Sequence, residues 1–328
     1  MTTLSRRILL GTSLTLPSIA LAQGFPSRPV RIVVPFPPGG AADITARLVA
    51  ERMSPLLGQP VLIDNRPGAG GNIAGEAVAR SAPDGHTVLL GSPTIFLANK
   101  YLYRSGMPFD GLTDFSHVSR VSVGTTLMVV RADKPWRTFQ DLVADAKRRP
   151  GQISAGSSGL GTISHLSLSK MMSSAGIEIT HVPYRGLAPS LNDLIAGNVD
   201  IIFDGIPAII PHVREGRLRA LAVGSQQRVT YVQGLEQTPG MAELLPGSGM
   251  DMEFWYSISG AANTPAPIVA ALHRATVAAV RQDSYRERLT PLGFTPVWDE
   301  SPEALVSFIR SQAGMWRELV ELSGARLD

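Results

Sequence analysis

Apolar and polar residues alternate in blocks along the first third of the chain, and the blocks switch between strand-like and helix-like periods. In residues 41–57 the apolar positions form one helical stripe, while Asp43, Arg47 and Glu51 form a polar one at four-residue steps. Short apolar runs on either side are typical of buried strands. The pattern predicts strands at 30–34, 61–63 and 87–90, separated by helices at 41–57 and 71–82. This order indicates a parallel sheet with helices on its faces.

The same alternation restarts in the middle of the chain. Leu187, Leu191 and Leu194 have the i, i+4, i+7 spacing of a helix with one apolar face. The second block predicts strands at 127–131, 152–155, 177–183, 199–204 and 218–223, and helices at 138–149, 162–175 and 187–195. A second α/β domain is therefore expected.

Two strand-like segments, 115–123 and 252–260, are predicted to connect the domains. Two long helices close the chain, one at 267–281 and one that begins at Ser301 and Pro302, a suitable N-cap and N1 pair. We expect one domain from residues 23–120 and 255–328 and a second from 121–254, joined by two crossings as a clamshell. Ligands of such sheets bind at the loops beyond the carboxyl ends of the strands, which would face each other across the cleft.

The first 22 residues have the pattern of a signal peptide. Arg6 and Arg7 precede an apolar stretch that ends in Ala20-Leu21-Ala22, which predicts cleavage after Ala22. The alternative is an N-terminal anchor helix, although the stretch is short for a bilayer span. Ser5-Arg6-Arg7 resembles a twin-arginine signal, so the export route stays open. We expect a soluble mature protein, located in the periplasm if the source is a bacterium.

Composition narrows the possible functions. Cleavage after Ala22 would lower the net charge from +3 to +1, which gives no reason to expect a nucleic-acid partner. The chain has no Cys, which excludes disulfides, thiolate metal ligands and a thiol nucleophile. Its six His show no metal-binding spacing, and no phosphate-binding Walker loop is present. No metal or cofactor is therefore expected.

The loop after the first predicted strand is a candidate anion site. Gly39 and Gly40 remove the side chains that would keep a ligand from the main chain, and the following helix start offers free N–H groups. The alternative is a tight strand-to-helix turn without a ligand. Asp43 would repel an anion if it pointed at it, so it is expected to satisfy loop amides or the helix start. The candidate residues of this loop are Phe36, Pro38, Gly39, Gly40, Ala41 and Asp43.

A second Gly-rich turn, at 155–165, has the same arrangement in the other domain. It resembles a dinucleotide fingerprint but lacks the third Gly, so a second anion-binding helix start is the simpler interpretation. His165 either donates a hydrogen bond to a ligand or has a structural role, packing against neighbouring residues or capping the helix. The candidate residues are Ser158, Gly159, Gly161, Thr162 and His165.

Further candidates follow other predicted strands. Arg185 could pair with a carboxylate or lie solvated on the surface. Beside it, the candidate set contains Tyr184, Asp204, Ser92, Thr94 and Asn99. The apolar run 95–97 indicates either a partly apolar ligand end or core packing.

Several motifs in a fixed order resemble the Bug-type solute-binding receptors of tripartite tricarboxylate transport systems. They are Pro35-Phe36-Pro37-Pro38-Gly39-Gly40 with Asp43, 64–71, Pro83-Asp84-Gly85-His86-Thr87, Gly156-Ser157-Ser158-Gly159-Leu160-Gly161-Thr162 with His165, Pro183-Tyr184-Arg185-Gly186, and 199–204. The resemblance covers essentially the whole chain. One departure is Arg185, where these receptors usually carry Lys.

The resemblance implies a monomeric two-domain receptor with the type II periplasmic-binding-protein fold and no cofactor. It implies that main-chain groups of the two Gly-containing loops and bridging waters hold a small organic carboxylate, which is then presented to cognate membrane permease subunits. A ligand sensor for a membrane signalling kinase is the milder alternative. A secreted hydrolase using Ser158 and His165 is a third reading, but no base-orienting acid occurs in a recognisable order.

Overall fold

The computed structural model describes residues 24–328, so the predicted signal peptide and its cleavage after Ala22 lie outside the described residues. The first part of the chain forms alternating strands and helices, as the pattern predicts. These elements are β1 (Val30–Val34), α1 (Ala41–Leu57), β2 (Val61–Asn65), the short 3-10 turn η1 (Ala69–Gly71), α2 (Asn72–Ala79) and β3 (Thr87–Gly91). β1 pairs in parallel with both β2 and β3.

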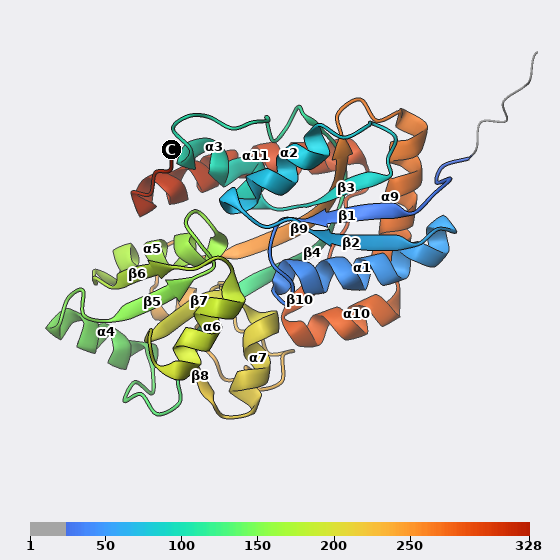
Figure 1. The fold of residues 1–328 in the computed structure, drawn as a ribbon. Helices are drawn as coiled ribbons and strands as arrows, with labels where there is room; N and C mark the ends of the chain where they lie inside the picture. The colour runs from blue at the N-terminus through green and yellow to red at the C-terminus, as the bar shows by residue number, and fades with distance from the viewer. Residues whose placement is uncertain (1–23) are drawn as a thin grey trace, which may run out of the picture.

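The middle of the chain forms a second set of alternating elements. They are α4 (Phe139–Arg148), β5 (Ser154–Ser157), α5 (Ile163–Ala175), β6 (Thr180–Pro183), α6 (Leu187–Ala196), β7 (Ile201–Gly205), α7 (Ile206–Arg214), β8 (Leu218–Val223) and α8 (Met241–Leu244). β5 pairs in parallel with β6 and β7. In Figure 1 these green and yellow elements form one half, while blue and orange-red elements form the other.

The two halves share one long strand. β4 (Phe115–Arg131) pairs with β9 (Glu253–Ala261) as far as Thr125, and with β7 from Thr126 onward. The pattern predicted separate strands at 115–123 and 127–131, which is wrong because the strand continues through Gly124. A Cβ atom at Gly124 would lie 2.4 Å from the Phe294 ring. Glycine therefore occupies this position because β10 (Phe294–Pro296) packs closely against the strand there, and not because the strand ends.

The chain returns to the first half through β9, which pairs antiparallel with β3 and β4. α9 (Ala266–Val280), α10 (Asp283–Leu289), the turn η3 (Thr290–Leu292) and α11 (Pro302–Ser323) complete it. The predicted N-cap is confirmed, because the Ser301 hydroxyl accepts a hydrogen bond from the Ala304 N–H at 3.2 Å. The result is the predicted α/β clamshell fold, with three parallel strands in each half and antiparallel crossing strands between them.

Several short elements were not predicted. α7 contains Pro207 and Pro211, which hide its helical pattern. The apolar run 95–97 lies in the π-helical segment η2 (Thr94–Ala98), which continues into α3 (Asn99–Leu102). Ile95, Phe96 and Leu97 are buried, so core packing is the correct interpretation of that run.

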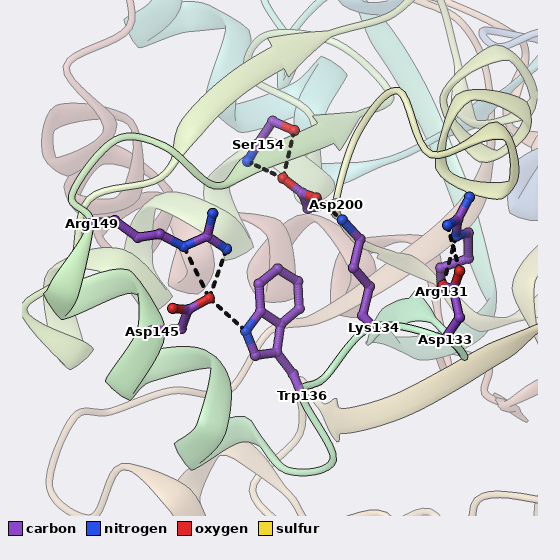
Figure 2. Close-up of polar contacts among 8 residues, drawn as sticks. All are labelled: Arg131, Asp133, Lys134, Trp136, Asp145, Arg149, Ser154 and Asp200. Carbon is purple, nitrogen blue, oxygen red and sulfur yellow. Dashed lines mark hydrogen bonds and ion pairs between the residues drawn. The ribbon is translucent and has the colours of Figure 1, made fainter.

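Paired charges occupy the amino-terminal ends of the strands in the second half (Figure 2). The Asp200 carboxylate accepts hydrogen bonds from Lys134 Nζ and from the N–H and hydroxyl of Ser154. Asp145 accepts from Arg149 and from the Trp136 indole N–H at 2.9 Å, and the hydrogen bonds from Arg149 hold its pKa at about 2. These groups satisfy one another at the end of the sheet opposite the loops that follow β5 and β7.

No helix within residues 24–328 combines the length and apolar character that crossing a membrane requires.

Candidate functional site

An inner cavity lies between the halves, at the carboxyl ends of the strands. The loops that follow β1, β3, β5 and β6 all contribute to its wall, together with β7, β9 and α11. The lining residues are Phe36, Pro37, Pro38, Gly40, Ala41, Ala42, Ser92, Pro93, Thr94, Ser158, Thr162, Ile163, Gly186, Leu187, Ala188, Asp204, Phe254, Tyr256 and Trp316.

The start of α1 forms one side of this cavity. Gly40 is the N-cap and has no side chain to accept from the first helical turn, so these N–H groups are open to a ligand. Asp43 turns away from the cavity and accepts hydrogen bonds from the N–H of Gly39 at 3.0 Å, from Asn65 at 3.0 Å and from Arg47 at 2.9 Å. Burial alone would raise the pKa of Asp43, but these hydrogen bonds lower it overall. Asp43 therefore fixes the loop.

Two further helix starts, those of α5 and α6, face the same cavity. Neither N-cap residue, Thr162 or Gly186, caps its helix with a side chain. The Thr162 hydroxyl donates instead to the Gly159 carbonyl at 2.7 Å, and the Gly186 N–H donates to the Ser158 carbonyl at 3.1 Å. Three uncapped helix N-termini thus converge, and each carries partial positive charge.

Asp204 is the one carboxyl group among the lining side chains. It is 6% exposed, and its carboxylate accepts from the Ser158 hydroxyl and from the Gly205 N–H at 2.7 Å. Burial raises its pKa, and these hydrogen bonds offset that only in part. Within residues 24–328 no cation is paired with it.

Two other buried atoms on the wall have no hydrogen-bond partner among the described residues. They are the Ser92 hydroxyl and the Trp316 indole nitrogen, on side chains 4% and 1% exposed. Burying an unpaired donor costs free energy, so both groups suit a cavity that a polar ligand or water fills.

The structure divides the predicted site residues into groups. Those that line the inner cavity are Phe36, Pro38, Gly40, Ala41, Ser92, Thr94, Ser158, Thr162 and Asp204. Gly159, Tyr184 and Arg185 line an adjoining outer cavity, which shares part of its wall with the inner one. Gly39, Asp43, Gly161, His165 and Asn99 line neither cavity. Direct contact with a ligand stays a prediction for all of them.

Asn99 and His165 hold loops instead. Asn99 is fully buried and donates to the Gly70 carbonyl at 3.1 Å and to Asn72 at 2.7 Å. His165 stacks on His181, with ring centroids 4.3 Å apart, and its Nδ1 accepts from the Gly161 N–H at 3.2 Å. Burial and the neighbouring His181 lower the pKa of His165 to about 4, so its ring is neutral.

The Ser158 and His165 pair required for the hydrolase reading does not form. Ser158 donates to Asp204, while His165 is engaged by Gly161 and His181. The serine that does contact a histidine is Ser157, whose hydroxyl lies 2.6 Å from His181 Nε2 and which is completely buried. A buried hydroxyl cannot reach a substrate.

Because His165 and His181 are buried as neutral rings, we expect the stability of the folded protein to fall in mild acid. Burial also lowers the pKa of His181 to about 4. Because both folded-state pKa values lie below the unfolded value of about 6.5, the stability that the neutral rings contribute is complete above pH 6.5 and is lost as the pH falls to about 4. Melting curves between pH 7.5 and 4.5 should show a falling Tm. Asn in place of His165 can accept from the Gly161 N–H and does not titrate. The Tm of H165N should therefore equal that of wild type at pH 7.5 and fall less than that of wild type at pH 4.5. An equal fall in Tm would show that protonation of His165 is not the cause of the acid sensitivity.

Comparison with known proteins gives the family. Residues 45–324 match the model of the tripartite tricarboxylate transporter family receptor. Protein BugT of Bordetella pertussis is 34% identical over 93% of this chain and 92% of its own length. Among solved structures, R. palustris Rpa4515 with adipate has a TM-score of 0.87 at 35% identity, covering 92% of this chain and all of that one. MatC from Rhodopseudomonas palustris with bound malate has a TM-score of 0.82 at 30% identity, covering 90% and 100%. This chain belongs to the tripartite tricarboxylate transporter receptor family and is a Bug-type member of it.

Proposed function

We propose that the chain is a periplasmic solute-binding protein that captures a small carboxylate in the inner cavity and delivers it to a tripartite tricarboxylate-type permease. The observation that carries this proposal is the convergence of three uncapped helix N-termini on one cavity whose lining includes no Lys, Arg or His. Main-chain N–H groups can bind a carboxylate without a fixed counter-ion. Adipate and malate in two relatives support this ligand class.

The test is a thermal-shift screen of the chain from residue 23 with mono-, di- and tricarboxylates, amino acids and sugars. A ligand present at about 100 times its Kd should stabilise the protein by about 2.7 kcal/mol, which is readily measured as a rise in Tm. Stabilisation by sugars or cations alone would contradict the proposal. Uptake of the identified acid by cells with and without the permease subunits then tests delivery.

The proposal includes closure of two domains, 23–120 with 255–328 and 121–254, about hinges near 117–124 and 249–259. β4 changes its pairing partner between Thr125 and Thr126, directly after the first hinge segment, which supports a hinge at this end of it. A ligand that contacts loops of both halves favours the closed state. Small-angle scattering should show a smaller radius of gyration at saturating ligand, and an unchanged radius would count against closure.

A further inference from the structure

Two hydrogen-bond donors on the wall of the inner cavity come from the first half of the molecule. Ser92 follows β3, and Trp316 lies on α11. α11 contacts η2, which begins at Thr94, so the packing of these two elements brings both donors to the same cavity. The two side chains are almost completely buried, and neither the Ser92 hydroxyl nor the Trp316 indole nitrogen has a hydrogen-bond partner within residues 24–328.

The remaining polar groups of the cavity leave these donors unused. Asp204, the one carboxyl group on the wall, accepts from the Ser158 hydroxyl and the Gly205 N–H instead. An indole N–H can only donate, so the partner that satisfies Trp316 has to be an acceptor. A buried donor without a partner costs free energy, and a ligand oxygen that accepts from it removes this cost on binding.

Much of the surface that faces the body of a ligand is apolar. Phe36 follows β1, Phe254 lies on β9, and Ile163 and Leu187 begin α5 and α6. Such surface stabilises hydrocarbon, whereas a ligand oxygen placed against it loses its water without compensation. The two unpartnered donors therefore mark a position at which the wall accepts an oxygen of the ligand body.

We propose that Trp316 and Ser92 form a second, uncharged subsite of the inner cavity, which donates hydrogen bonds to an acceptor oxygen on the body of the ligand. The receptor then selects carboxylates that carry a further oxygen group, a hydroxyl or a second carboxyl, over hydrocarbon acids of the same length. This inference rests on the proposed function, because the helix starts hold the carboxylate that places the ligand body against the subsite.

The first test measures the affinity of the wild-type chain from residue 23 for two matched series of acids by calorimetry. One series is butanoate, its ω-hydroxy derivative and succinate, and the other is hexanoate, its ω-hydroxy derivative and adipate. Within a series only the far end of the carbon chain gains oxygen. We expect an oxygenated acid of at least one series to bind at least tenfold more tightly than the unsubstituted acid, about 1.4 kcal/mol, because the unsubstituted acid leaves both donors unpaired.

The outcomes of this comparison separate the inference from the proposed function. If the unsubstituted acids of both series bind as tightly as the oxygenated ones, the inference is overturned and the proposed function stands. If none of these acids binds, the inference is overturned as well, and the wider thermal-shift screen decides the proposed function. Tighter binding of the hydroxy acid or of the diacid supports the inference and identifies the group that the subsite accepts.

The second test replaces Trp316 with Phe, which removes the N–H and keeps an aromatic ring on the wall. W316F should bind the oxygenated acid of the discriminating series at least tenfold more weakly than wild type does, while affinity for the unsubstituted acid changes by less than threefold. Loss of packing alone would weaken both acids alike, so the difference between them reports the hydrogen bond. W136F is the matched control, because Trp136 is equally buried and its indole N–H donates to Asp145, away from the cavity lining.

S92A removes the second donor with a smaller change in shape and should weaken the oxygenated acid selectively as well. S167A is its control, because Ser167 on α5 is also fully buried, its hydroxyl has no partner among the described residues, and it lines neither cavity. Selective weakening in W316F and S92A, and not in the two controls, supports the subsite. Equal weakening of both acids, or unchanged affinity for both, overturns it. If W316F is poorly folded, S92A alone decides between these outcomes.

Discussion

Replacing Gly40 with Val is expected to weaken carboxylate binding at least a hundredfold, about 2.7 kcal/mol. Gly40 lines the inner cavity at the start of α1, with φ −84° and ψ 175°, a conformation that Val adopts readily. No atom lies within 4 Å of the position its Cβ would take, so the new side chain projects into the space that the ligand must enter. Calorimetry with the acid identified in the thermal-shift screen measures the loss.

The fold should survive this change. A β-branched N-cap in place of Gly costs about 1 kcal/mol of helix stability, a small shift in Tm. G314V is the control, because Gly314 is exposed on α11 and also has no neighbour within 4 Å of its Cβ position. Unchanged carboxylate affinity in G40V would show that the start of α1 does not contact the ligand.

Valine at Gly161 would not be an equivalent test. Gly161 has φ +72°, and a Cβ there would lie 2.3 Å from Leu102 in the other half of the molecule. A valine there would strain the backbone and push the halves apart. Loss of binding in that variant could then follow from these effects and not only from the loss of a ligand contact. Gly40 is therefore the informative position.

The fold was predictable because its two periodicities are clear in the sequence. Helices that pack one face on a sheet, such as α1 and α6, show their apolar stripe directly, and buried parallel strands such as β1 read as apolar runs. α7 was missed because two prolines interrupt its pattern, although Pro207 lies in the first turn, where it is tolerated. The continuity of β4 depends on how Phe294 packs against Gly124, a contact between residues distant in sequence.

The candidate site was predictable where polar residues such as Ser92 and Asp204 end or follow a predicted strand, and where the loops are Gly-rich turns. Gly40 and Thr162 belong to such turns and line the inner cavity. Phe254, Tyr256 and Trp316 were missed, because on a strand or helix an apolar side chain that faces a cavity has the same spacing as one that faces the core. His165 shows a different limit: its position in a helix start left open whether it donates to a ligand or packs and caps, and in the structure the side chain turns to the Gly161 N–H and His181.

Replacing Asp299 with Ala is expected to lower the free energy of unfolding by about 3–5 kcal/mol. Asp299 is 4% exposed and precedes α11. Its carboxylate accepts from the main-chain N–H of Arg120 at 2.8 Å and from the guanidinium Nε and Nη2 at 3.0 and 2.8 Å, while the guanidinium lies 3.9 Å from the centre of the Phe308 ring. These bonds attach the segment before α11 to β4, so Ala would leave the Arg120 N–H and guanidinium without this partner.

Chemical denaturation of the two proteins measures this loss. E215A is the matched control, since Glu215 pairs with Arg217 while both side chains are about half exposed, and exposed pairs contribute about 0–1 kcal/mol. D299N should fall between D299A and wild type, because its amide oxygen can still accept from Arg120. If D299A costs no more than E215A, water replaces the lost bonds and this pair does not hold the closing helix to the crossing strand. β4 is shared by both halves. If the free energy of unfolding of D299A falls by a similar large amount with and without ligand, the attachment to β4 stabilises the whole fold and not only the open or the closed form of the cleft.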